Sequence, residues 1–136
     1  MRAFAIAFIL IVIGYSCYGQ NSAEFDRCVD GAKPQSVLNE CASEEAMLAD
    51  SELKTTSDGF LAKIAGDSRA IAKFKEAERI WRLYREAYIE AVFPAQDKQI
   101  AYGTEYPMDV NLLRAKLTRE HLGAITYLVS EYQPTQ

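Results

Sequence analysis

The feature that most constrains the fold of this chain is a long apolar stripe at helical spacing between residues 71 and 92. Its members recur every three or four positions, with lysine and arginine between them: Ile71, Phe74, Ala77, Trp81, Tyr84, Tyr88 and Val92. Asp67 or Ser68 can cap the start of this segment, and Pro94 ends it. The pattern predicts one long helix whose apolar face packs against other elements.

Two further segments show helical periodicity. The first begins near Ser36, weakens around Gly59, where the helix can break, and closes at Gly66. The second follows a capping residue, Asp109. Residues 94–108 contain two prolines and a glycine and are expected to form a loop. No segment of comparable strength alternates with a period of two residues, so we predict an all-α fold, a small three-to-four-helix bundle.

The N-terminal segment has the pattern of a secretory signal peptide. A positive start precedes an uncharged apolar run over residues 3–13, which is too short to span a bilayer. Cys17 and Gly19 stand at the −3 and −1 positions of a cut before Gln20. A lipoprotein acylated at Cys17 is less favoured because Gly14 replaces a large aliphatic residue, and an uncleaved anchor is a third alternative. We expect a periplasmic or secreted protein with no stable membrane span after cleavage.

These patterns divide the chain into four parts. Residues 1–19 are the expected signal peptide, and residues 20–35 an extended N-terminal segment. Residues 36–132 form the expected helical domain, and residues 133–136 a tail.

Cysteine usage agrees with export. Cys28 and Cys41 remain after removal of the signal peptide, an even number for an oxidising compartment. A bridge between them would stabilise the domain by on the order of 3 kcal/mol in the chain-entropy model. A metal site is a poorer explanation, because His121 is the one histidine and lies far along the chain. We therefore expect a structural disulfide, with no metal and no cofactor.

Charge and motifs exclude several function classes. The net charge is −4, so a general nucleic-acid binder is not expected. Catalysis at His121 would need a nucleophile and an orienting group. The chain has no Gly-x-Ser-x-Gly, no glycine-rich phosphate loop and no His-Glu-x-x-His. Paired carboxylates remain open, but a small helical domain offers little cleft for a sugar chain, so the chain is not expected to be an enzyme.

Three pieces of sequence carry a resemblance to a known family. They are Asn-Glu-Cys-Ala-Ser-Glu-Glu at residues 39–45, Glu-Ala-Glu-Arg-Ile-Trp-Arg-Leu-Tyr-Arg-Glu-Ala at residues 76–87, and Leu117-Thr118 with Leu122. Their order, with the glycine loop at residues 102–104, resembles the LprI-like lysozyme-inhibitor family of exported bacterial proteins. The resemblance covers residues 28–128 and implies a helical fold and an inhibitor-type function.

The chain departs from the family pattern at four positions. Ile89 and Leu113 stand where many members have a second disulfide, and we expect an apolar contact to replace that bridge. Ser57 stands where an aromatic residue is common, and His121 where arginine is common.

The middle of the predicted long helix holds a cluster of aromatic and charged residues. Trp81 and Tyr84 share the apolar stripe and can touch, so we interpret them as core aromatics. Arg85 is expected to bridge to an acid on a neighbouring helix. An exposed recognition cluster is the alternative. His121, on the stripe of the last helix, is interpreted as a partly buried packing residue.

Two other sets of residues are candidates for contact with a partner. The loop residues are Tyr102, Thr104, Glu105 and Tyr106, and the alternative is that these tyrosines cover the end of the bundle. The candidates for electrostatic steering are Glu44, Glu45 and Glu52, in an acidic stretch that precedes a basic one. The alternative is that the two stretches pair weakly as neighbouring helix faces.

These features together predict an inhibitor that binds a protein partner, a peptidoglycan-cleaving enzyme, with host lysozyme as the first target. An acidic inhibitor would be steered to a basic lysozyme. The alternatives are a cell-envelope interaction module that inhibits nothing, and an immunity protein against a rival bacterium's cell-wall hydrolase.

Overall fold

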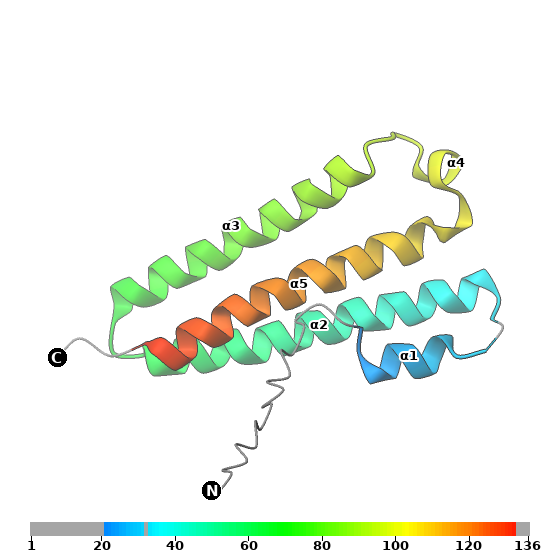
Figure 1. Cartoon of the computed structure of the whole chain (residues 1–136). Helices are drawn as coiled ribbons and strands as arrows, with labels where there is room; N and C mark the ends of the chain where they lie inside the picture. Colours follow the sequence, from blue (N-terminus) through cyan, green and yellow to red (C-terminus); the bar gives the residue numbers. More distant parts are fainter. Residues whose placement is uncertain (1–20, 32, 133–136) are drawn as a thin grey trace, which may run out of the picture.

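The computed structural model describes residues 21–31 and 33–132, and these residues form an all-α bundle (Figure 1). The helices are α1 (Ala23–Val29), α2 (Gln35–Lys63), α3 (Ser68–Val92), α4 (Lys98–Tyr102) and α5 (Tyr106–Glu131), with a 3₁₀ turn, η1 (Gly103–Glu105), before α5. The predicted fold class is thus confirmed. The expected signal peptide and the tail lie outside the described residues. None of the helices in the described part of the chain is long and apolar enough to cross a membrane.

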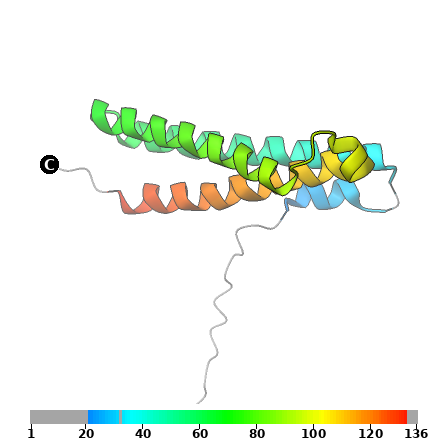
Figure 2. The same ribbon diagram turned by 90° about the horizontal axis from the view of Figure 1, so that it is seen from above.

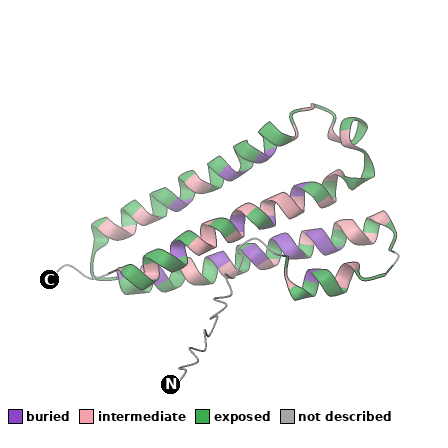
Figure 3. Cartoon of the chain, in the orientation of Figure 1, coloured by how far each residue is buried: buried purple, intermediate pink, exposed green. Residues whose placement is uncertain are grey.

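The centre of the bundle is the contact between α2 and α5, which run in the same direction, while α3 runs the opposite way (Figure 1). Small side chains line this contact: Ala46 and Ala49 of α2 pack with Ala115 of α5. Because alanine has no side chain beyond Cβ, the two helices can approach closely. Figure 3 shows the buried residues along the facing sides of both helices.

The N-terminal segment differs from the expected extended start, because residues 23–29 form α1. Ser22 caps this helix by accepting a hydrogen bond from the backbone N–H of Phe25. The Cys28–Cys41 disulfide, with Cα atoms 5.7 Å apart, ties α1 to α2. Phe25 packs on Cys41 and Ala42, so the bridge and an apolar cluster hold α1 in place.

Helix α2 is continuous through Gly59, so the helix does not break at the point where the sequence allowed it. Helix α2 ends at Lys63, and a short turn containing Gly66 leads into α3. Asp67 caps α3 by accepting hydrogen bonds from the backbone N–H groups of Arg69 and Ala70. The capping prediction is therefore confirmed at Asp67.

Helix α3 is packed less tightly than its apolar stripe predicts. In both views it lies on a different side of the α2–α5 pair from α1 (Figures 1 and 2). At its start, the Phe74 ring lies 4.7 Å from that of Phe60, centroid to centroid. Ile89 is buried near its end, while Leu113 of α5 is half-buried. Tyr84, expected in the core, is 58% exposed, because the stripe is wider than the surface that α2 and α5 offer.

The segment expected to be a loop over residues 94–108 is largely helical. Asp97 caps α4 by accepting from the backbone N–H of Ile100. Gly103 has φ = +71°, a conformation that favours glycine, and redirects the chain between α4 and α5. Helix α5 begins at Tyr106 with Pro107 in its first turn, ahead of the expected cap at Asp109.

Candidate functional site

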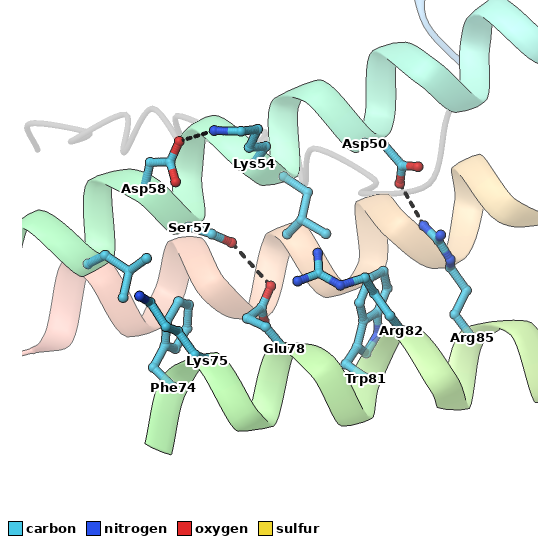
Figure 4. A pocket seen from close by; sticks show the side chains of 12 residues that line it. Asp50, Lys54, Ser57, Asp58, Phe74, Lys75, Glu78, Trp81, Arg82 and Arg85 are labelled. Carbon is cyan, nitrogen blue, oxygen red and sulfur yellow. Dashed lines mark hydrogen bonds and ion pairs between the residues drawn. The ribbon is translucent and has the colours of Figure 1, made fainter. Parts of the chain in front are cut away.

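A groove of about 600 Å³ lies between α2 and α3 (Figure 4). Apolar side chains form part of its lining: Leu53, Leu61, Phe74 and Trp81. Charged and polar side chains form the rest: Asp50, Lys54, Ser57, Asp58, Lys75, Glu78, Arg82 and Arg85. Several of these charges pair with one another or with α5.

Arg85 joins all three long helices beside this groove. Its Nη1 donates to Asp50 Oδ1 of α2 at 2.6 Å and to Thr118 Oγ1 of α5 at 2.8 Å. Its Nε donates to Glu86 at 3.0 Å, and Glu86 also accepts from Arg114 of α5. The side chain is 10% exposed, so its charge depends on these acceptors in place of water. This network links α3 to the α2–α5 pair.

Glu78 forms a second polar link within the bundle. Burial alone would raise the pKa of this carboxyl, but hydrogen bonds from His121 and Ser57 and the positive charges nearby hold it below its ordinary value. His121 Nε2 lies 2.6 Å from Glu78 Oε1, and Ser57 Oγ donates to Glu78 Oε2 at 3.2 Å. Ser57 of α2 thus supplies a hydrogen bond to α3.

Trp81 contacts two of these polar groups. The His121 ring stacks on Trp81 with centroids 4.0 Å apart and planes 6° apart. The guanidinium carbon of Arg85 lies 5.1 Å from the centroid of the Trp81 ring. Trp81 and His121 are both half-buried, and the contact joins α3 to α5. Tyr84 takes no part in this contact and lies instead near Tyr88, with centroids 6.0 Å apart.

The structure separates the three acids proposed for steering. Glu44 is exposed and Glu52 is half-buried, but Glu45 is only 2% exposed. Glu45 accepts from the backbone N–H of Ser22 at 2.8 Å, from the Ser22 hydroxyl and from Arg119 of α5. Burial acts to raise the pKa of Glu45, but these hydrogen bonds lower it overall. The expectation that Glu45 steers a partner is corrected, because its carboxylate joins α5 to the chain before α1.

Arg119 completes this cluster and was not singled out from the sequence. It donates to Glu45, and its Nε lies 3.6 Å from Glu52. A signal was present, because Glu45 lies four residues after Cys41 and four before Ala49, on the apolar face of α2. A carboxylate on that face requires a cationic or hydrogen-bonding partner from a neighbouring helix.

The predicted contact loop is a braced projection at the end of the bundle. Tyr102 and Tyr106 pack on Phe93, with centroids 5.3 and 5.4 Å away. The Tyr102 hydroxyl accepts from the backbone N–H of Ala95 at 3.1 Å. Both tyrosines are half-buried, so they cover the bundle end and hold the projection in shape.

The outer surface of this projection comes from its other residues. Thr104 and Glu105 are exposed, and Ile100 is 85% exposed, more than any other large hydrophobic residue of the described chain. The Thr104 carbonyl accepts from Asn39 of α2 at 3.0 Å, which fixes η1 to the bundle. Lys98 binds Glu90 and the Phe93 carbonyl and is therefore held within the projection.

The fold and these sites define a small, disulfide-linked helical domain. Its interior charges are paired with one another, and the α4–η1 segment at one end is braced by contacts with Phe93 and Asn39. Comparison with known families then assigns the chain. The family model described as "Lysozyme inhibitor LprI" matches residues 28–124, so the chain belongs to the LprI lysozyme-inhibitor family. No curated protein and no solved structure matches the chain.

Proposed function

We propose that this protein is an exported inhibitor that binds a peptidoglycan-cleaving enzyme, with host lysozyme as its first target. The observation that carries the proposal is the match of residues 28–124 to the lysozyme-inhibitor family. The chain's acidic charge, with a sequence pI near 5.0, supports it, because lysozymes of animals are strongly basic. The signal-peptide pattern of residues 1–19 also supports the proposal, because an exported protein would meet such an enzyme.

The contact surface in this proposal is the projection formed by α4 and η1, with Ile100, Thr104 and Glu105 at its surface. A lysozyme cleft carries two catalytic carboxylates and is concave, so an inhibitor needs a convex element to block it. The projection is already ordered by its own contacts, and binding therefore costs little conformational entropy. An exposed Ile100 on a rigid element can act as an apolar anchor in the cleft.

Electrostatic attraction would accelerate the encounter. Glu44 is exposed on α2 and Glu105 on the projection, and both add negative potential to the surface. Such steering raises the association rate and weakens as salt screens the charges. Inhibition is therefore expected to be stronger at low salt than at physiological salt.

The test is a titration of residues 20–136, with the disulfide intact, into a lysozyme assay on purified cell walls. Wild type should inhibit stoichiometrically, and Ile100→Asp should raise the inhibition constant at least about tenfold, as expected for loss of an apolar anchor. Tyr127→Asp is the matched control, because Tyr127 is 65% exposed near the other end of α5. An unchanged constant in Ile100→Asp would remove the projection from the proposal.

Lack of inhibition by the wild-type protein would exclude host lysozyme as the target. The envelope-module and immunity interpretations would then be tested by capture of a defined bacterial cell-wall hydrolase.

A further inference from the structure

The outer face of α3 carries an uninterrupted apolar stripe that the bundle does not cover. Its large members are each between 45% and 59% exposed: Ile80, Leu83, Tyr84, Tyr88 and Val92. Ala87 and Ala91 lie between them and are also exposed. At 100° per residue these side chains fall within one half of the helix circumference over about three and a half turns.

This stripe is distinct from the face of α3 that packs on the bundle. The buried residues of α3 are Glu78, Arg85 and Ile89, which recur on another side of the helix. The stripe thus lies largely outside the packing face of α3, and each of its large members keeps at least 45% of its surface exposed. An apolar patch of this kind on an exported domain is characteristic of an interaction surface.

We propose that a second copy of this chain covers the stripe, with the two α3 helices packed antiparallel about a two-fold axis. In a two-fold interface each surface meets its own copy, so the patch must be self-complementary. The N-terminal half of the stripe carries the bulky Ile80, Leu83 and Tyr84, whereas in the C-terminal half the small Ala87 and Ala91 alternate with the bulky Tyr88 and Val92. An antiparallel arrangement can place Ile80 of one copy between the two alanines of the other, at both ends of the contact.

Charge distribution selects the same arrangement. Arg79 and Glu90 are eleven positions apart, which places them about 20° apart around the helix, on one edge of the stripe. Antiparallel packing sets Arg79 of one copy opposite Glu90 of the other. Parallel packing about a two-fold axis along the helices would face this edge with the opposite edge of the partner's stripe and would leave these two charges unpaired between copies. Within one chain Arg79 pairs with Glu76, and Glu90 pairs with Lys98, so the contact between copies would join two existing ion pairs.

The size of the stripe predicts a concentration-dependent dimer. Five half-exposed large side chains offer roughly 100 Å² each, or about 500 Å² of apolar surface per copy. A standard interface buries about 800 Å² per partner, so this contact lies at the small end of the range even with its charged edges. The α4–η1 projections follow the C-terminal ends of the two α3 helices and so lie at opposite ends of the dimer, free to bind separate partners.

The test is sedimentation velocity on residues 20–136 across a micromolar concentration series. The proposal predicts a monomer–dimer equilibrium whose dissociation constant rises at least about tenfold in Leu83→Glu, because each charge would be buried in the contact. Tyr127→Glu, which adds the same charge outside the stripe, should leave the equilibrium unchanged. Thermal unfolding of both variants checks that the fold is kept.

A charge exchange tests the orientation. Arg79→Glu and Glu90→Arg should each weaken the dimer, and the double variant should recover it. A monomer at every concentration would overturn the proposal, as would a dimer that Leu83→Glu leaves intact. The antiparallel arrangement would be overturned if Leu83→Glu weakens the dimer, but the double variant Arg79→Glu/Glu90→Arg fails to restore the dimer that each single charge variant weakens.

Discussion

Glu44 and Glu45 are neighbours in the sequence with opposite environments, which allows a sharp test of the structure. Glu45 is buried and binds Ser22 and Arg119, whereas Glu44 points to solvent. Replacing Glu45 by alanine leaves the Arg119 guanidinium, 12% exposed, without its main acceptor. Removing one partner of a buried pair costs about 3–5 kcal/mol. Glu44→Ala should change the free energy of unfolding by less than about 0.5 kcal/mol.

Urea unfolding followed by far-UV circular dichroism measures both variants. At about 4 °C per kcal/mol for a domain of this size, Glu45→Ala should also lower the melting temperature by roughly 12–20 °C. The double variant Glu45→Ala/Arg119→Ala should lose less stability than the sum of the two single variants, because the two side chains share one interaction. Equal losses of unfolding free energy in Glu44→Ala and Glu45→Ala would refute the assignment of Glu45 as the buried partner of Arg119.

Three further predictions follow from the same contacts. Removing the Cys28–Cys41 bridge by a double serine substitution should lower the free energy of unfolding by about 3 kcal/mol, measured by urea titration, because α1 then depends on its apolar contacts alone. Arg85→Ala should cost about 3–5 kcal/mol, while Arg82→Ala, an exposed residue one turn earlier on α3, should cost less than about 0.5 kcal/mol in the same assay. The carboxyls of Glu45, Glu78 and Glu86 have pKa values lowered from 4.5 in the folded protein. The stabilisation that they contribute is fully present above pH 4.5 and is lost as the pH falls through the folded-state pKa values. The urea midpoint should therefore decline below pH 4.5 and should not change between pH 5 and 7 because of these groups.

The long helices could be predicted because their signals are local. Apolar periodicity, the Asp67 cap and the Pro94 stop act within a few residues, and the structure places α2, α3 and α5 accordingly. Helix α1 was missed because seven residues carry too little periodicity. It is held by a disulfide and by the contact between Ser22 and Glu45, both of which come from residues distant in sequence.

The candidate site was harder to predict, because burial depends on which helix lies opposite. Glu45 and Tyr84 show this in opposite directions, since the acid is buried and the aromatic residue is exposed. The segment over residues 94–108 was expected to be a loop from its prolines and glycine. Pro94 instead follows the end of α3, Gly103 ends α4, and Pro107 lies in the first turn of α5, where proline and glycine are accommodated.

The most direct test of the central claim is the titration of the disulfide-bonded protein, residues 20–136, into lysozyme acting on cell walls at low and at physiological salt. The account predicts stoichiometric inhibition that weakens with salt and is reduced about tenfold by Ile100→Asp but not by Tyr127→Asp. Full lysozyme activity in the presence of micromolar wild-type protein, at both salt concentrations, would contradict the account.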